Sequence, residues 1–247
     1  METLTNVDDV TQSESPDPQI LTSSHPQIHS PIRLVVFDLD GTLVDSRRDI
    51  AESANATLVA FGAPPLSEEA IGRMVGDGAP VLVARAFAAQ GVEKPREALN
   101  RFLSIYNSRL LTHTRPYSGM IRVLDDLAPR MALGVLTNKP LAATRAILDG
   151  LDLARYFPEE RVLGGDGPFP RKPDPAGLQR LMALCGVSGR ETVLVGDSVI
   201  DWRTTRAAAT RACLARYGFG WDAFPIQELQ LDAAWLIGEP LELLQYL

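Results

Sequence analysis

The stretch RLVVFDLDGTLVDS, residues 33–46, places two carboxylates at the end of a strongly apolar run. The apolar residues Leu34–Phe37 lead into Asp38, and Asp40 follows two positions later. A carboxylate beside buried apolar surface is costly unless a cation or a hydrogen-bond donor pairs with it. The two acids are therefore either a solvated strand end or part of a site that holds a cation.

The overall composition is typical of a globular protein with an acidic balance. The 247 residues are 45% hydrophobic and 22% charged, and 31 acids against 24 bases give a net charge of -7. Surfaces that bind nucleic acid or anionic membranes need clustered Lys and Arg. We therefore expect no nucleic acid and no membrane as main partner, whereas a small phosphorylated substrate needs only a local basic site. The sequence leaves both a monomer and a homodimer open.

The cysteines and the apolar runs indicate the compartment. Cys185 and Cys213 form no CxxC pair, and we expect both to be packing residues. No apolar run approaches the roughly 18 residues that a membrane span needs. The N-terminus lacks the basic start and apolar stretch of a secretory signal. These features predict a reduced, cytoplasmic protein.

Short apolar runs that favour strands alternate with helical patterns after residue 30. Continuous apolar strands separated by helices are typical of a parallel sheet covered on both faces. We therefore predict an α/β fold with a doubly wound parallel sheet. The predicted strands span residues 34–38, 131–137, 161–164, 192–197, 213–217 and 233–237.

A long segment with helix signals almost throughout separates the first two predicted strands. Its apolar stripes are typical of a small bundle with its own core, and they lie in predicted helices at residues 46–61, 80–90 and 95–111. We expect an all-helical cap at residues 45–116, inserted into a core made of residues 31–44 and 117–247. Residues 1–30, rich in Ser, Thr, Pro, Asp and Gln, are predicted to be a disordered tail.

Polar and charged residues gather where the predicted strands end. In an open parallel sheet, ligands bind beyond the carboxyl ends of the strands. Carboxylate oxygens there suit Mg²⁺, and a lysine, a hydroxyl and backbone N–H groups suit phosphate oxygens. The set predicts phosphoryl transfer, in which one carboxylate attacks phosphorus and another moves a proton. Its members are Asp38, Asp40, Thr137, Asn138, Lys172, Asp197, Ser198 and Asp201.

Four segments resemble the successive motifs of the haloacid dehalogenase superfamily of phosphohydrolases: FDLDGTLVDS, TNKP, KPDP and VGDSVID. TNKP, the GDG turn in the helical segment and the run YGFG are most similar to the phosphoglycolate phosphatase subgroup. The resemblance covers roughly residues 33–220, with the motifs in order. It implies a Rossmannoid core with an inserted cap that selects the substrate. It also implies a Mg²⁺-dependent phosphatase, with 2-phosphoglycolate as the favoured substrate.

The resemblance also implies a catalytic or phosphate-binding role for five residues. Asp38 matches the family's nucleophile, which forms an aspartyl-phosphate, and Asp40 matches its general acid/base. Lys172 and Thr137 match the ammonium and the hydroxyl that bind the phosphate. Asn138 is expected to add its backbone N–H.

The implied metal ligands are drawn from four acids. They are the Asp38 carboxylate, the backbone carbonyl of Asp40 and the Asp197 carboxylate. Asp201 is a further candidate, either near the Mg²⁺ or holding the lysine.

Several of these residues have a plain structural alternative. Asp201 also suits a first helical turn, where it stabilises the helix dipole, and Asn138 suits a helix cap. Arg85, in the predicted cap, is a candidate for binding a substrate carboxylate but equally for a solvated face. Ala209 stands where the subgroup usually has Gly, at a cost of about 1 kcal/mol if the helix ends there in a left-handed conformation.

Other functions remain open at this point. The same chemistry serves phosphatases or phosphomutases that act on a sugar phosphate, pyrophosphate or a nucleotide. A dehalogenase is disfavoured because that branch lacks the acid at the position of Asp40. A receiver-like signalling module phosphorylated on aspartate also uses clustered acids, a Thr and a Lys, but it is about half as long and has no inserted cap.

Overall fold

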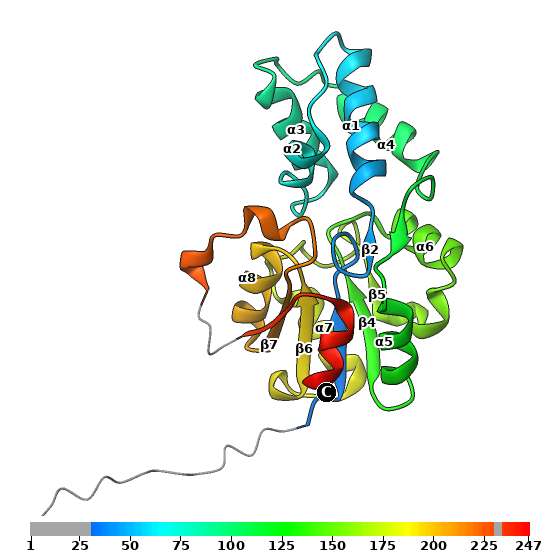
Figure 1. Ribbon diagram of the computed structural model, residues 1–247, viewed down its shortest axis with the longest axis vertical. Coiled ribbons are helices and arrows are strands. Elements are labelled where there is room, and N and C mark those ends of the chain that lie inside the picture. The colour runs from blue at the N-terminus through cyan, green and yellow to red at the C-terminus, as the bar shows by residue number, and fades with distance from the viewer. Residues whose placement is uncertain (1–30, 230–233) are drawn as a thin grey trace, which may run out of the picture.

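The structure, a computed structural model, describes residues 31–229 and 234–247 (Figure 1). The predicted disordered tail, residues 1–30, lies outside the described residues. The described chain forms two parts: a sheet with flanking helices, which we call the core, and helices α1–α4, which we call the cap.

The core sheet has six strands in the order β5-β4-β1-β6-β7-β8. Every neighbouring pair is parallel, so the carboxyl ends of all six strands meet at one edge, as the sequence predicts. The order reverses at β1, which pairs with β4 on one side and β6 on the other. The strands are β1 (Leu34–Phe37), β4 (Ala132–Leu136), β5 (Val162–Leu163), β6 (Thr192–Gly196), β7 (Arg211–Ala215) and β8 (Ala234–Ile237).

Alternate residues of β1 pack against opposite layers of helices. Val35 and Phe37 belong to the apolar cluster that includes residues of α5, α6 and the C-terminal η7, whereas Leu34 and Val36 pack with residues of α7 and α8. Both faces of the strand are thus buried, which explains its uninterrupted apolar sequence. The helices are α5 (Met120–Leu127), α6 (Leu141–Gly150), α7 (Ala176–Cys185) and α8 (Val199–Ala208), with 3₁₀ segments η1 (Ala154–Tyr156), η2 (Glu159–Arg161), η3 (Gly189–Glu191), η4 (Trp221–Ala223), η5 (Ile226–Glu228) and η7 (Pro240–Gln245).

The cap packs around an apolar core of its own, which includes Leu58, Phe87 and Phe102. The chain enters it through β2 (Val44–Asp45) and returns through β3 (Arg115–Pro116), and these two strands pair antiparallel. Figure 1 shows the cap beyond the sheet, with β2 between the two parts. The cap helices are α1 (Arg47–Ala60), α2 (Glu68–Gly72), α3 (Ala79–Ala89) and α4 (Ala98–Asn107).

A buried carboxylate joins the two segments that connect cap and core, the one that follows β2 and the one that precedes β3. The Asp49 side chain, on the first turn of α1, accepts hydrogen bonds from the backbone N–H groups of His113 and Thr114 and from the Thr114 hydroxyl, each at 2.8 Å. A hydrogen-bonded carboxylate of this kind fixes the start of α1 against the returning chain. It thereby fixes where the cap begins relative to the sheet edge.

Some predicted element ends differ from the structure. The predicted helix 95–111 is shorter, because the N–H groups of Ser108 and Arg109 bond three residues back and tighten the chain into a turn after Asn107. The predicted strand 213–217 begins two residues earlier, because Arg211 pairs with Val193 of β6. None of the helices among the described residues is long and apolar enough to cross a membrane.

Helix α8 ends in a left-handed conformation, the possibility considered above for Ala209. Ala209, its C-cap, has φ 52° and ψ 42°. Left-handed backbone is costly for a residue with a Cβ atom. The structure therefore keeps the strained position despite the absence of Gly.

Candidate active site

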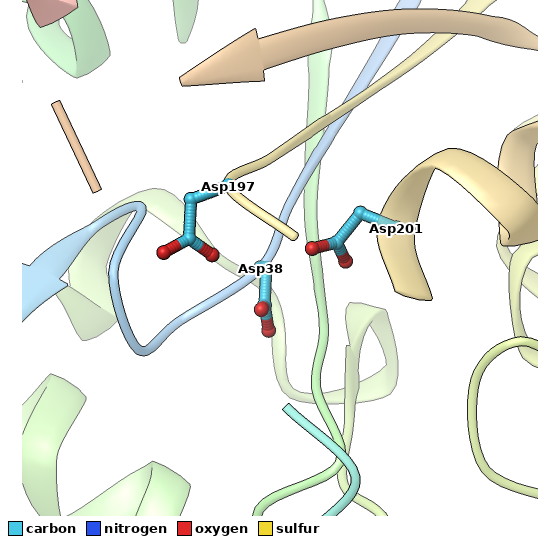
Figure 2. Close-up of side chains that lie close together, drawn as sticks. All are labelled: Asp38, Asp197 and Asp201. Atoms are coloured by element: carbon cyan, nitrogen blue, oxygen red, sulfur yellow. The ribbon is translucent and has the colours of Figure 1, made fainter. Parts of the chain in front are cut away.

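Three carboxylates meet at the carboxyl edge of the sheet (Figure 2). Asp38 directly follows β1, Asp197 follows β6, and Asp201 lies in the first turn of α8. One oxygen from each of the three side chains lies within 4.8 Å of the others, and all three residues are buried. The reversal of strand order at β1 therefore brings together acids that are more than 150 residues apart in the chain.

Lys172 lies among these acids. Its Nζ is 2.9 Å from Asp38 Oδ1 and 2.6 Å from Asp201 Oδ1. Burial alone would lower the pKa of Lys172, but Asp201 and Asp38 outweigh it and raise the pKa, so the side chain stays an ammonium. The structure thus pairs Asp201 with the lysine, one of the two positions that the sequence left open.

Burial, and then the neighbouring carboxylates, disfavour the ionised forms of Asp38 and Asp197. Burial raises the pKa of Asp38 to about 6, against the opposing Lys172, and Asp201 and Asp40 add to the rise. Burial also raises the pKa of Asp197 well above its ordinary value, with Asp201 and Asp38 adding to it. Ionised, the three carboxylates carry -3 against +1 on Lys172, so -2 is left over. A hard divalent cation such as Mg²⁺, which prefers oxygen ligands, fits both the charge and the donor set.

Two glycines leave room for the Asp197 carboxylate. A Cβ atom on Gly41, whose φ is +84°, would lie 1.9 Å from Asp197 Oδ2, and one on Gly218 would lie 2.5 Å from it. Further along the same turn, the N–H of Gly220 donates to Asp197 Oδ2 at 2.7 Å. The glycines of DGT and YGFG therefore leave space for the Asp197 carboxylate, which explains why glycine is needed in these two motifs.

Asp40 faces a different set of partners. Its Oδ2 lies 2.9 Å from Nζ of Lys139, and its Oδ1 accepts a hydrogen bond from the Ser46 hydroxyl at the entrance to the cap. Both oxygens of this carboxylate are thus held, although Asp40 is two residues from Asp38. Lys139 and Ser46 each lie inside a motif quoted above, TNKP and FDLDGTLVDS, but neither was predicted to have a role.

Lys139 also reaches the cap. Its Nζ donates to the hydroxyl of Tyr106 on α4 at 2.7 Å and lies 4.4 Å from the centre of that ring. Burial opposes a charge on Lys139, but Asp40 and Tyr106 raise its pKa. Burial raises the pKa of Tyr106 to about 12, against the opposing Lys139, so the phenol keeps its proton. The apolar stripe of α4 that we assigned to the cap's core thus also delivers a polar group to the site.

Asn138 holds three segments together. Its Nδ2 donates to the carbonyls of Gly76, in the GDG turn of the cap, at 2.8 Å and of Lys172 at 3.0 Å. Its Oδ1 accepts from the backbone N–H of Lys172 at 2.8 Å. The Asn138 side chain is therefore a clamp between cap and core, and its backbone N–H has no acceptor among the described residues.

The hydroxyl groups of Thr137 and Ser198, both near the carboxyl edge of the sheet, have different partners. Thr137 is buried, lines the cavity described below, and accepts from the backbone N–H of Lys139 at 3.2 Å. Ser198 forms a capping box with Asp201: its Oγ accepts from the Asp201 backbone N–H, and Asp201 Oδ2 accepts from the Ser198 backbone N–H. The Ser198 hydroxyl also donates to Asp201 Oδ2 at 2.6 Å. Asp201 is thus both a first-turn helix acid and a member of the carboxylate cluster, since each oxygen serves one partner.

A cavity of about 60 Å³ lies between the sheet edge and the cap. Its core side presents Asp38, Asp40, Asp197, Thr137 and Asn138. Its cap side is mostly apolar, with Ile50, Val75, Leu82 and Phe102 beside the polar Tyr106. This small volume suits a ligand well below the size of a typical drug-like molecule.

Arg85 lies elsewhere. Its guanidinium pairs with Asp77 at 2.7 Å and donates to the carbonyl of Met74 at 3.1 Å, and the side chain is 46% exposed. It is not among the residues that line the cavity. The structure therefore does not bring Arg85 together with the other predicted site residues.

Comparison with known proteins matches these features. The family model described as haloacid dehalogenase-like hydrolase matches residues 35–215. A phosphoglycolate phosphatase of Rhodospirillum rubrum is 43% identical over 196 residues, which are 76% of this chain and 80% of that protein. Phosphoglycolate phosphatase 1 of Pseudomonas aeruginosa is 37% identical over 195 residues, covering 76% of this chain and 70% of that protein.

A solved structure has the same fold. The crystal structure of a predicted phosphoglycolate phosphatase from Haemophilus somnus superimposes with a TM-score of 0.80 at 28% identity, over 87% of this chain and 97% of that one. The motif order, the fold with its inserted helical cap and the family match agree. The chain belongs to the haloacid dehalogenase-like hydrolases and is a phosphoric monoester hydrolase.

Proposed function

We propose that this protein is a Mg²⁺-dependent phosphatase that converts 2-phosphoglycolate to glycolate and phosphate through an aspartyl-phosphate on Asp38. The observation that supports this most is the cluster of Asp38, Asp197, Asp201 and Lys172, of which Asp38 and Asp197 line a small cavity. Such a cluster joins a nucleophilic carboxylate to the charges that bind a phosphoryl group.

In the first step, an oxygen of Asp38 attacks phosphorus and the ester P–O bond breaks. Lys172 balances charge on the transferred group, since its Nζ is 2.9 Å from the attacking carboxylate. The hydroxyl of Thr137 and the free N–H of Asn138 are donors for the remaining phosphoryl oxygens. This step leaves a phosphoryl group on Asp38.

Asp40 moves the proton in both steps. It gives a proton to the leaving ester oxygen in the first step and takes one from water in the second. Water then attacks phosphorus, the bond to Asp38 breaks, and phosphate leaves with both acids regenerated. The hydrogen bonds from Ser46 and Lys139 hold Asp40 in place for this exchange.

The carboxylates of Asp38 and Asp197 and the carbonyl of Asp40 would hold Mg²⁺. Asp201 would hold Lys172 and lie close to the cation. When bound, Mg²⁺ neutralises charge on the phosphoryl oxygens and on the carboxylates. The -2 charge that the cluster carries when ionised supports this assignment.

The substrate is proposed from the relatives and from the size of the cavity. Two relatives named phosphoglycolate phosphatase are 43% and 37% identical, and the small cavity beside Asp38 and Asp40 favours a short phosphomonoester over a bulky one. Sugar phosphates, pyrophosphate and nucleotides are the alternative substrates that a screen must include. The family match and the inserted cap argue against the receiver-like module. We also place the protein in the reducing cytoplasm, which accords with its two free cysteines.

Phosphate release from a panel of small phosphomonoesters, with Mg²⁺ and with EDTA, tests the function. We expect Mg²⁺-dependent turnover that is highest with 2-phosphoglycolate and absent in Asp38→Asn. Asp40→Asn should slow both steps and let phosphoenzyme accumulate. Turnover by Asp38→Asn at the wild-type rate would refute the nucleophile, and a higher kcat/KM for another phosphate would refute the substrate.

A further inference from the structure

The cavity wall holds a second polar feature besides the carboxylates, formed by Lys139 and Tyr106. Both line the cavity and both are buried, with 8% and 3% of their surfaces exposed. Lys139 is the only cationic residue among the described residues that line it. The cap side chains around them are apolar, so Lys139 and Tyr106 are the polar groups that a ligand would meet on that side of the cavity.

Each of the two groups has a hydrogen-bond donor left over. An ammonium has three N–H donors, and Lys139 uses one toward Asp40 and one toward the Tyr106 hydroxyl. The hydroxyl of Tyr106 accepts that bond, and its own proton has no acceptor among the described residues. Buried donors without acceptors are rare in folded proteins. The pair is therefore ready to bind an acceptor that enters the cavity.

We propose that Lys139 and Tyr106 form a subsite for the carboxylate of the substrate, and so restrict this phosphatase to phosphate esters of short hydroxy acids. This inference rests on the proposed function, because it places the phosphoryl group at Asp38 and the leaving oxygen beside Asp40. In such an ester the carboxylate is one carbon from the leaving oxygen. Lys139 Nζ, 2.9 Å from Asp40 Oδ2, lies next to that position.

The number of donors favours a carboxylate over a second phosphoryl group. One N–H and one O–H match the two oxygens of a carboxylate, whereas a phosphoryl group presents three oxygens and more charge. A singly charged carboxylate also matches the single positive charge of the Lys139 ammonium. Because Tyr106 comes from α4 and Lys139 from the core, the bound carboxylate would also hold the cap to the sheet edge.

The test compares two substrates that differ only at this group. In 2-hydroxyethyl phosphate a neutral CH₂OH replaces the carboxylate of 2-phosphoglycolate. For wild type we expect kcat/KM to favour 2-phosphoglycolate by roughly 10- to 100-fold, as hydrogen bonds to a charged group would give. Tyr106→Phe should reduce this ratio about 10-fold, and Lys139→Met should bring it near one. Lys139→Met also disturbs Asp40, but that effect is common to both substrates and cancels in the ratio.

The chain offers a matched control in Lys94, an exposed lysine of the cap. Lys94→Met should keep the wild-type ratio and the wild-type rates. An unchanged ratio in Tyr106→Phe, which keeps the Lys139–Asp40 pair, would overturn the subsite even if Lys139→Met fails to fold.

Three further outcomes are distinct. If wild type hydrolyses both esters equally well, the subsite is wrong while the proposed phosphatase activity stands. If pyrophosphate is a better substrate than 2-phosphoglycolate, a second phosphoryl group rather than a carboxylate occupies this end. If wild type releases phosphate from neither ester nor pyrophosphate, the proposed function itself fails, and the subsite fails with it.

Discussion

Two of the chain's three lysines are buried near the carboxyl edge of the sheet, and they differ in what surrounds them. Lys172 lies 2.9 Å from Asp38 and 2.6 Å from Asp201, all within the core. Lys139 lies 2.9 Å from Asp40 and 2.7 Å from a tyrosine of the cap. Each lysine thus serves one acid of the DLD sequence, but only Lys139 also links the core to the cap.

The two lysines therefore have different roles in one site: Lys172 belongs to the groups for phosphoryl transfer, and Lys139 to the contact with the cap. On the Lys172 side, three carboxylates lie around the ammonium of this lysine. These groups set the local charge for phosphoryl transfer. The Lys139 side is mostly apolar, and its polar groups come from two parts of the chain, so its geometry depends on the position of the cap. Loss of Lys172 should therefore harm charge balance and stability most, whereas loss of Lys139 should disturb Asp40 and, in addition, change substrate choice.

The largest expected effect comes from Lys172→Met. Removing the ammonium leaves Asp38 and Asp201 buried without their partner, which should cost about 3–5 kcal/mol of unfolding free energy and roughly 10³-fold in kcat. Lys139→Met should cost less, about 1–3 kcal/mol, because Asp40 keeps its bond from Ser46. Urea denaturation and initial rates measure both quantities. Equal losses of stability in the two variants would contradict the distinction between the two sides.

Mg²⁺ tests the carboxylate side directly. Binding to the folded protein at 100 times its Kd should stabilise it by about 2.7 kcal/mol, seen as a rise in Tm that EDTA reverses. Asp197→Asn removes one carboxylate but keeps both contacts of Lys172, so it should lose most of that rise. Without Mg²⁺ this variant should be more stable than wild type, because a buried repulsive carboxyl is gone. A full Mg²⁺ response in Asp197→Asn would exclude Asp197 as a ligand.

The two sides also differ in how far the sequence predicts them. The strands and the residues at their carboxyl ends follow from the apolar runs and from the rule that ligands bind at that edge. Asp38, Asp197, Asp201 and Lys172 were therefore all candidates, and the structure brings these four together. Each follows a strand or lies in a quoted motif, so local sequence was enough to mark it.

Lys139 and Tyr106 were missed for a physical reason. Tyr106 lies at helical spacing among apolar residues of α4, and such a stripe normally predicts only the core of a bundle. Its hydroxyl gains a role from the placement of the cap over the sheet, which no local pattern encodes. Arg85 is the converse case: its position suggested either a ligand for a substrate carboxylate or a solvated face, and in the structure it pairs with Asp77. Contacts between cap and core are thus the part that sequence left undecided.

The Asn138 clamp gives a smaller test of cap placement. Asn138→Ala removes the side-chain bonds to Gly76 and Lys172 and should cost about 2 kcal/mol, together with a rise in KM as the cap loosens. Asn55→Ala is the matched control, since the Asn55 amide likewise bonds to backbone groups, donating to and accepting from Leu66 at 2.8 Å, but wholly within the cap. Asn55→Ala should lower stability without changing KM. A similar rise in KM for both variants would show that cap stability, not the clamp, governs binding.

The smallest predicted effect concerns the helix that carries Asp201. Ala209→Gly relieves the left-handed backbone at the end of α8 and should stabilise the protein by about 1 kcal/mol. Ala208→Gly, one residue earlier in regular helix, should destabilise it by a similar amount. Neither substitution touches a charge, so kcat should stay at the wild-type value in Ala209→Gly. If kcat instead changed with the stability of α8, the position of Asp201 beside Lys172 would depend on helix strain as well as on charge, and the two lysine sites would differ less than their contacts indicate.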